Sequence, residues 1–307
     1  MHSNAISVAG LTKRFGERLA VDHLDIEVPS GVVAGFVGPN GAGKTTTMAM
    51  LLGLVRPTSG TGAVLGESIE EPAAYLHEVG ALIETPAFYP SLTGAENLRM
   101  FATVGRHDSA SIPALLDEVG LGDRGDDRYR SYSLGMKQRL GIAAALLGDP
   151  RLLILDEPAN GLDPQGVREM RSLVGDLAGT GRTVLVSSHD LSELEQVCDW
   201  LVLIDTGRSL YQGPTSQLLD GVVHGVAVAT ACAEERPVLQ SVLRSEGFEF
   251  ALDGERLVVA LDGRDVATVA AAVNRVAFEA GMVLAELSPL RTTLEDRYLA
   301  MVDGGVR

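Results

Sequence analysis

A short glycine-rich segment has the composition needed to surround a phosphate chain. Residues 38–45, Gly-Pro-Asn-Gly-Ala-Gly-Lys-Thr, fit the pattern G-x-x-x-x-G-K-[ST]. Glycines let successive backbone N–H groups converge, and the start of a following helix adds positive potential. Lys44 is expected to reach the β- and γ-phosphates of a nucleotide, and the Thr45 hydroxyl to bind Mg²⁺. The residues of this loop predicted to hold the nucleotide are Gly38, Asn40, Gly41, Gly43, Lys44, Thr45 and Thr46.

Two adjacent acids follow an apolar run of strand length. The run Leu-Leu-Ile-Leu covers residues 152–155, and Asp156 and Glu157 come next. In an open α/β sheet the carboxyl ends of the strands face the ligand crevice. We therefore expect Asp156 to hold Mg²⁺ through water and Glu157 to polarise the water that attacks the γ-phosphate. The simpler alternative is that one of these acids only caps the turn at Pro158.

Buried strands must position these residues. Continuous apolar runs predict strands covered on both faces, and hence a parallel sheet with helices on either side. We expect strands over 31–37, 152–155 and 183–186, and a helix over 44–54. Strand signals nearly vanish over about 93–148, which predicts a helical insert.

Predicted helix starts carry capping residues. An acceptor followed three residues later by Glu is typical of a capping box, and an acceptor followed by Pro is typical of a helix start. The pairs concerned are Thr93 with Glu96, Asp190 with Glu193, and Asp163 with Pro164.

After about residue 220 the pattern of elements changes. The predicted order is strand, helix, strand, strand, helix, strand and a terminal helix, and Asp253-Gly254 predicts a hairpin between the second and third strands. The expected ranges are 222–230, 234–245, 248–252, 257–261, 265–280, 282–287 and 293–301. The order βαββαβ is typical of a small ferredoxin-like α+β module. Length also predicts two domains, which we place at 1–220 and 221–307.

Composition excludes several classes of function. The chain has 307 residues and a net charge of −16, a field that repels nucleic acids and anionic lipid surfaces, so we expect no nucleic-acid partner. Two cysteines, Cys198 and Cys232, exclude a disulfide framework and a Cys-rich zinc site. We expect no signal peptide, and no run approaches the roughly 20 apolar residues that span a bilayer. We expect a cytoplasmic protein, so a membrane process would need another chain for its membrane part.

Further motifs resemble those of the ABC ATPases. Residues 132–139, Tyr-Ser-Leu-Gly-Met-Lys-Gln-Arg, resemble the signature sequence of that family. Residues 160–163 resemble its D-loop, and residues 187–190 resemble its H-loop. Phe15 matches the aromatic position that stacks on adenine. Order and spacing agree across about the first 220 residues.

The resemblance implies roles for individual residues. Phe15 would stack on adenine, and His189 would contact the γ-phosphate as part of the catalytic machinery. Ser133 and Gly135 would form an anion site at a helix start, and Asp163 of the D-loop would lie at the nucleotide. Simpler alternatives are a surface or core role for Phe15, a structural role for His189 and an N-cap role for Ser133.

The chain carries one phosphate loop and one signature. In ABC ATPases the signature of one domain completes the nucleotide site of the other. The resemblance therefore implies a head-to-tail homodimer that holds two ATP molecules with Mg²⁺ between its subunits. The implied fold is an α/β P-loop NTPase of the ABC type, with a parallel-sheet core, an antiparallel β subdomain and a helical insert.

Two sites depart from the common family pattern. Within the signature, Leu134 and Met136 stand where Gly and Gln are commonest. At the Q-loop, Glu84 stands where Gln is usual. Glu84 is also an oxygen ligand for Mg²⁺, and we expect it to act in catalysis and to couple the nucleotide site to a membrane partner. The alternative is a solvated surface acid.

Subgroup likeness implies a transport role. Residues 80–98 resemble the bacitracin-, lantibiotic- and daunorubicin-type export ATPases, and residues 294–299 match a recurrent ending of drug-export ATPases. The implied function is the ATP-hydrolysing subunit of a bacterial exporter of an antibiotic, peptide or lipid. It would lie on the cytoplasmic face of the membrane through a separate permease. A soluble non-transport ABC ATPase and an importer subunit are the alternatives.

Overall fold

The computed structural model describes residues 4–84, 87–219, 223–291 and 293–304. The chain divides into two compact units, residues 1–218 together with 298–307, and residues 219–297. The boundary expected between residues 220 and 221 lies outside the described residues. Residues 298–307, expected in the accessory module, belong to the first unit instead.

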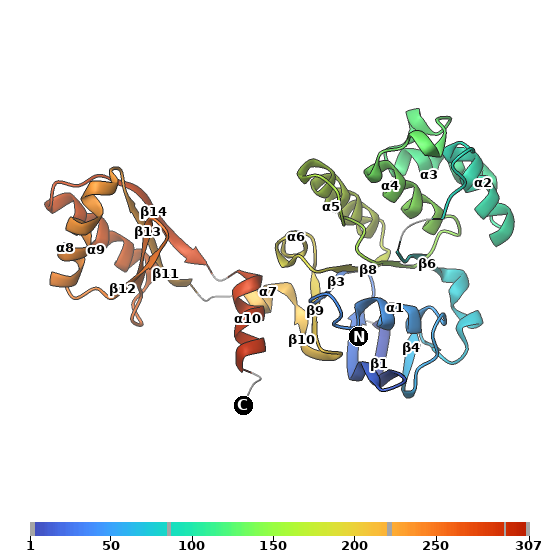
Figure 1. Ribbon diagram of the computed structural model, residues 1–307, viewed down its shortest axis with the longest axis horizontal. Coiled ribbons are helices and arrows are strands. Elements are labelled where there is room, and N and C mark those ends of the chain that lie inside the picture. Colours follow the sequence, from blue (N-terminus) through green and yellow to red (C-terminus); the bar gives the residue numbers. More distant parts are fainter. Residues whose placement is uncertain (1–3, 85–86, 220–222, 292, 305–307) are drawn as a thin grey trace. The chain divides into compact units, whose positions relative to one another are not determined.

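A six-stranded sheet forms the centre of the first unit, in the order β10-β9-β3-β8-β7-β6 (Figure 1). Its strands are β3 (Val33–Val37), β6 (Val79–Leu82), β7 (Leu152–Leu155), β8 (Thr183–Ser188), β9 (Trp200–Asp205) and β10 (Arg208–Pro214). Neighbouring strands from β9 to β6 run parallel, and β10 pairs antiparallel with β9. Every residue of β3, β7 and β8 is buried, which confirms the two-sided parallel sheet predicted from the apolar runs.

Helices cover both faces of this sheet (Figure 1). Helix α1 (Lys44–Leu51) lies on one side, and α5 (Pro164–Gly179) and α6 (Leu191–Glu195) lie on the other. Met48 of α1 shares a buried cluster with Phe36 of β3 and Val8 of β1. The helix expected over 44–54 ends earlier, because Gly53 adopts a left-handed φ of 67° directly after the last turn.

A second sheet is antiparallel, in the order β2-β1-β4-β5. Its strands are β1 (Asn4–Phe15), β2 (Arg18–Pro29), β4 (Ser59–Val64) and β5 (Glu67–Ser68). This sheet is the antiparallel β subdomain that the family resemblance implied. At the end of the β1–β2 hairpin, Phe15 is paired directly with Arg18.

The segment between β6 and β7 is helical, as expected. It contains α2 (Gly94–Gly105), α3 (Ile112–Glu118) and α4 (Leu134–Ala145). Thr93 and Glu96 form the predicted capping box at the start of α2. The guanidinium of Arg182 lies 2.9 Å from Glu118 of α3 and 2.9 Å from Asp149, so it ties the insert to the loop before β8.

The predicted caps at Asp163 and Asp190 differ in how completely they form. Asp163 caps α5 by accepting a 2.7 Å hydrogen bond from the Gly166 N–H, with Pro164 in the first turn. Asp190 caps α6, but Glu193 accepts from the Ser188 hydroxyl rather than from the Asp190 backbone. The second capping box is therefore only half formed.

Short elements complete the described chain. Helix α7 (Thr215–Leu219) follows β10, and α10 (Leu294–Gly304) crosses the boundary between the two units. Single 3-10 turns occur at Pro72–Ala74, Leu76–Glu78, Ser109–Ser111, Gly122–Arg124, Tyr129–Ser131 and Ala233–Glu235. Among the residues the structure describes, no helix has the length and apolar character needed to cross a bilayer.

The second unit is a four-stranded antiparallel sheet in the order β12-β13-β11-β14, covered by two helices (Figure 1). Its elements are β11 (Val223–Thr230), α8 (Arg236–Ser245), β12 (Phe250–Asp253), β13 (Arg256–Ala260), α9 (Val266–Glu279) and β14 (Leu284–Arg291). Val226 of β11, Leu239 of α8 and Val273 of α9 share its buried core. The order βαββαβ with this pairing is the expected ferredoxin-like module. The predicted hairpin is present, with Gly254 in its turn at φ 58°.

Candidate nucleotide-binding and catalytic site

The predicted catalytic segments begin at one edge of the central sheet. The loop at 38–45 follows β3, Asp156 follows β7, and His189 follows β8. Because β3, β8 and β7 are parallel neighbours, their carboxyl ends meet at the same edge. The fold therefore brings together residues that lie more than a hundred positions apart in the chain.

Lys44 is held in place by the loop that precedes it. Its side chain is only 6% exposed, and Nζ donates a 2.6 Å hydrogen bond to the Gly38 carbonyl oxygen. Gly43, directly before it, has a φ of 103°, and a Cβ there would stand 2.6 Å from the Ala20 carbonyl oxygen. Only glycine fits that position, so the loop can turn tightly into α1.

Two hydroxyl groups hold the carboxylate of Asp156. The Thr45 hydroxyl donates to Oδ2 at 2.7 Å, and the Ser187 hydroxyl donates to Oδ1 at 2.5 Å. The Ser187 oxygen also accepts the Glu157 backbone N–H at 2.9 Å. The structure thus places two hard oxygen donors, from Thr45 and Asp156, side by side. The sequence analysis included Ser187 only as part of the H-loop and did not predict it as a site residue. Its position near the end of β8 is the signal that could have identified it.

Glu157 lies between two basic side chains. Its Oε1 is 3.2 Å from Lys44 Nζ, and its Oε2 is 2.7 Å from His189 Nδ1. The Glu157 backbone has a φ of 49°, which is uncommon for a residue with a side chain and costs conformational energy. His189 is about half exposed, so the carboxylate–imidazole pair faces solvent.

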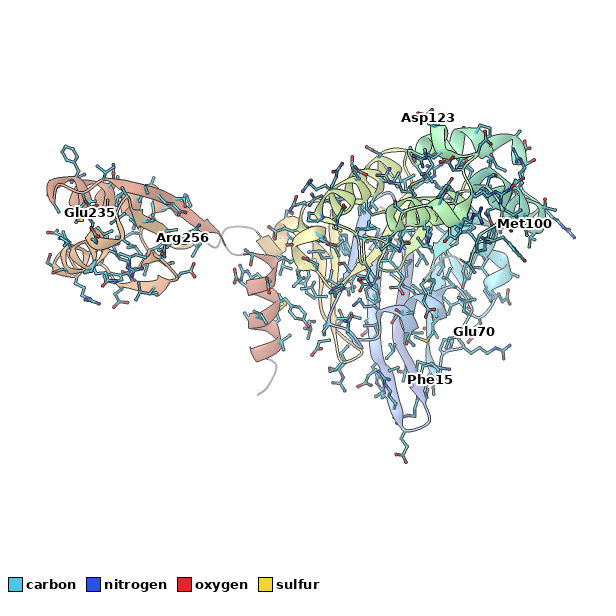
Figure 2. All side chains as sticks on the ribbon, turned by 45° about the horizontal axis from the view of Figure 1, so that its top comes forward. Phe15, Glu70, Met100, Asp123, Glu235 and Arg256 are labelled. Carbon is cyan, nitrogen blue, oxygen red and sulfur yellow. The ribbon has the colours of Figure 1, made fainter. Side chains whose placement is uncertain are left out.

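A pocket of about 370 Å³ lies beside this cluster, on the side of Lys44, Thr45 and Glu157. The residues that line it are Phe15, Arg18, Ala20, Asn40, Gly41, Gly43, Lys44, Thr45, Thr46, Glu157 and Asn160. Phe15 is 49% exposed near the end of the β1–β2 hairpin, where an aromatic base can reach its ring (Figure 2). Gly38 does not line the pocket, and there is no room for a Cβ on it beside the Ile204 carbonyl oxygen. Arg18 and Asn160 were not predicted as site residues.

The signature residues lie at a separate hollow of about 460 Å³. Ser133, Gly135 and Asp163 line it, and none of them lines the pocket around Lys44. The Ser133 hydroxyl accepts the Met136 N–H at 3.3 Å as the N-cap of α4. Ser133 is therefore the N-cap residue of α4, as the simpler alternative held, and its hydroxyl lies at the rim of an open hollow.

Glu84 lies just beyond the end of β6, next to the strand that carries Asp156. The Asp156 N–H donates to the Leu82 carbonyl oxygen at 2.8 Å, which ties the two strand ends together. Glu84 itself is exposed and has a left-handed φ of 59°. It lines neither hollow within the part of the chain that the structure describes. Among the described residues Glu84 forms no hydrogen bond or ion pair with Lys44, Asp156 or Glu157, so its role in catalysis and Mg²⁺ binding stays a prediction.

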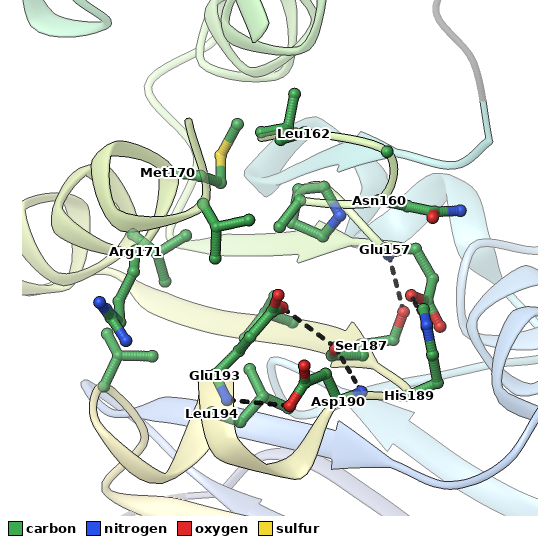
Figure 3. A pocket seen from close by; sticks show the side chains of 18 residues that line it. Glu157, Asn160, Leu162, Met170, Arg171, Ser187, His189, Asp190, Glu193 and Leu194 are labelled. Atoms are coloured by element: carbon green, nitrogen blue, oxygen red, sulfur yellow. Dashed lines mark hydrogen bonds and ion pairs between the residues drawn. The ribbon is translucent and has the colours of Figure 1, made fainter. Parts of the chain in front are cut away.

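A third hollow, of about 150 Å³, lies below the D-loop and the H-loop (Figure 3). Its walls combine the segments that follow β7 and β8, including Glu157 and His189, with side chains of α5 and α6, among them Glu193. Burial raises the pKa of Glu193, with a further contribution from the charge of Asp190. Hydrogen bonds from Ser192 lower the pKa of Asp190. Sequence reasoning did not find this hollow, because it depends on how α5 and α6 pack.

Comparison with known proteins decides the family. The sequence pattern described as "ABC transporter" matches residues 21–160. The bacitracin transport ATP-binding protein of Bacillus licheniformis is 38% identical over 307 residues, covering 99% of each chain. The chain belongs to the ATP-binding proteins of the ABC transporter family.

Other ABC transporter proteins are similar over the first unit. The lantibiotic transport ATP-binding protein of Streptococcus pyogenes is 39% identical over 207 residues, covering 67% of this chain and 90% of its own. A solved structure of the ATP-binding subunit of an ABC transporter is 30% identical, with a TM-score of 0.62 over 70% of this chain and 91% of its own. These matches confirm the predicted family and the P-loop NTPase fold. As an ABC ATPase, the chain is expected to bind and hydrolyse ATP at the cluster around Lys44.

Proposed function

We propose that this protein is the ATP-hydrolysing subunit of an exporter of a peptide antibiotic or a related amphiphilic compound, and that it works with a separate membrane permease. The contacts that join Lys44 and His189 to Glu157, and Thr45 to Asp156, beside a pocket lined by Lys44, Thr45 and Glu157, carry this proposal. The similarity to bacitracin and lantibiotic transport ATP-binding proteins supports the class of cargo.

The residues present fit a magnesium nucleotide. Mg²⁺ is usually held by one or two carboxylates together with substrate phosphates, and among the described residues no cluster of three His, Cys, Asp or Glu could form a self-sufficient metal site. Thr45 and Asp156 would hold Mg²⁺, which when bound neutralises phosphate charge. Lys44, whose buried ammonium contacts Glu157 and the Gly38 carbonyl oxygen, would bind the β- and γ-phosphates.

Glu157 is the group in this cluster best placed to accept a proton from water. Its carboxylate faces the pocket that Lys44 also lines. His189 fixes the orientation of that carboxylate from the solvent side. General bases of this kind contribute about 10²- to 10⁴-fold to a rate.

The separation of the two hollows supports a head-to-tail homodimer. Ser133 and Gly135 form a helix-start anion site that their own subunit's phosphate loop does not share. A second copy, rotated by a two-fold axis, would place that site over the pocket around Lys44. Two such composite sites would form in each dimer.

The surface of the helical insert supports docking of an apolar partner. Tyr89 is 56% exposed, and Phe101 and Val104 of α2 are 41% and 84% exposed. Figure 2 shows Met100 of the same helix at the outer surface. A permease segment that covered these side chains would contact the insert close to the end of β6, where Glu84 lies.

Copurification with the permease tests the transport role. The candidate partner is a polytopic membrane protein encoded next to this chain, if one is found there, and both chains are expressed together and reconstituted in lipid vesicles. We expect the two chains to elute as one complex whose ATP turnover rises with bacitracin or a lantibiotic as cargo. A chain that hydrolyses ATP but associates with no membrane protein would contradict the exporter role.

A further inference from the structure

Arg18 is a basic residue that belongs to none of the motifs described above. It stands opposite Phe15 in the β1–β2 hairpin, and directly opposed residues of an antiparallel pair project to the same face. The connection is only Gly16 and Glu17, with Gly16 at φ 57°, so the hairpin end fixes both positions. Phe15 and Arg18 both line the 370 Å³ pocket.

The guanidinium of Arg18 lies over the phosphate loop. One of its terminal nitrogens is 3.9 Å from the point where a Cβ on Gly41 would stand. Arg18 and Lys44 are the cations among the described residues that line this pocket. The two therefore approach the space between the hairpin and the loop from opposite sides.

Among the residues that the structure describes, no acid holds Arg18. It forms no ion pair among the residues that the structure describes, although acids outnumber bases 41 to 25 in the chain. The one acid lining the same pocket, Glu157, already contacts Lys44 and His189. An unpaired guanidinium beside a loop of backbone N–H groups suits a phosphate, with which Arg forms charge-assisted and often bidentate hydrogen bonds.

We propose that Arg18 binds the phosphate chain of the nucleotide, between the base on Phe15 and the phosphates at Lys44. This inference rests on the proposed nucleotide site. Because Arg18 is on the hairpin side, it would bind the phosphates that ADP and ATP share. It would thus set how tightly ADP is retained after hydrolysis, in addition to how tightly ATP is bound.

Titration calorimetry of the full chain with MgADP tests this assignment. We expect Arg18→Ala to weaken MgADP binding about fivefold, a change that corresponds to about 1 kcal/mol for one exposed charged contact. Arg18→Lys should lose less, because it keeps the charge and loses only the fork geometry. Arg14→Ala is the matched control, since Arg14 lies in the same hairpin, is exposed, and does not line the pocket.

Two further measurements separate the possible outcomes. Adenosine, measured by competition, lacks phosphates and should bind Arg18→Ala as it binds the wild type. The salt dependence of MgADP affinity should flatten in Arg18→Ala but not in Arg14→Ala. Equal affinities for the Arg18→Ala and Arg14→Ala proteins, or an equal loss for adenosine, would overturn the assignment. A wild-type chain that binds neither MgADP nor MgATP would instead contradict the proposed function.

Discussion

Nδ1 of His189 lies 2.7 Å from Oε2 of Glu157, and the two residues follow neighbouring parallel strands. The pair fixes the carboxylate at the mouth of the pocket while its other oxygen contacts Lys44. This arrangement gives Glu157 a defined direction before any nucleotide binds, so its replacement should affect hydrolysis more than binding.

Replacing Glu157 by Gln removes the base and keeps the shape of the side chain. We expect ATP turnover to fall by about 10²- to 10⁴-fold, while ATP still binds and holds two copies together. Phosphate release and light scattering with MgATP measure the two effects. Glu71→Gln, at an exposed acid away from the pocket, is the control and should behave like the wild type. An unchanged hydrolysis rate in Glu157→Gln would rule out its role as base.

Substitutions of Asp156 and Ser187 should distinguish the metal ligand from the residue that orients it. Asp156→Asn removes the charge that would hold Mg²⁺, so we expect turnover to be lost at every Mg²⁺ concentration. Ser187→Ala keeps the carboxylate, removes its hydrogen bond to Oδ1 together with the acceptor of the Glu157 N–H, and should raise the half-saturating Mg²⁺ concentration by about tenfold. A magnesium titration of turnover distinguishes them. Identical Mg²⁺ curves for Ser187→Ala and the wild type would show that this hydrogen bond does not orient the ligand.

Mixing two inactive variants tests the composite site of the homodimer. Lys44→Ala removes the phosphate cation, and Gly135→Asp puts a negative charge into the signature hollow, where a Cβ finds Leu162 at an ordinary 3.7 Å. A mixed dimer keeps one site with Lys44 from one copy and Gly135 from the other. Random mixing gives about half mixed dimers, so we expect about a quarter of wild-type turnover. A mixture as inactive as its components would show that each copy hydrolyses ATP with its own signature.

Glu84 is tested in the reconstituted complex with the permease. Its exposed position beyond β6 and away from the pocket suits a contact with a partner. We expect Glu84→Ala to reduce cargo-stimulated ATP turnover severalfold, and Glu84→Gln, which keeps a polar chain of the same length, to reduce it less. Cargo uptake into inverted vesicles and phosphate release are measured together. Normal transport with normal turnover in Glu84→Ala would remove Glu84 from both catalysis and coupling.

Glu193 should make the first unit less stable at neutral pH. Burial raises its pKa above the unfolded value, so ionisation costs folding free energy above that value, and the cost disappears as pH falls and the group is protonated. Glu193→Gln keeps an acceptor for the Ser188 hydroxyl. We expect its unfolding midpoint to exceed that of the wild type by up to about 2 °C at pH 7.5, with the gap closing near pH 4. A difference in unfolding midpoint that does not change with pH would contradict this role of Glu193. The Glu71→Gln protein controls for the change in net charge.

The buried central strands of the first unit and two of its helix starts could be predicted from local pattern. Apolar runs located β3, β7 and β8, and side-chain acceptors located the starts of α2 and α5. The second capping box was predicted from spacing alone and formed only in part, because Glu193 bonds to Ser188 instead. Sequence spacing identifies a candidate hydrogen-bond partner for Glu193, whereas the packing of α6 against α5 decides which partner its side chain contacts.

The sequence by itself determined the pieces of the site: a glycine loop before a helix, two acids after an apolar run, and a histidine after another. These are local signals, since strand periodicity and backbone freedom act over a few residues. Only the tertiary structure decided which pieces meet, because the strand order β3-β8-β7 arises from packing between distant segments. The tertiary structure brought Thr45 to Asp156 and Glu157 to His189. It also placed Arg18 at the pocket that Lys44 lines, whereas Glu84 and the signature residues do not line that pocket.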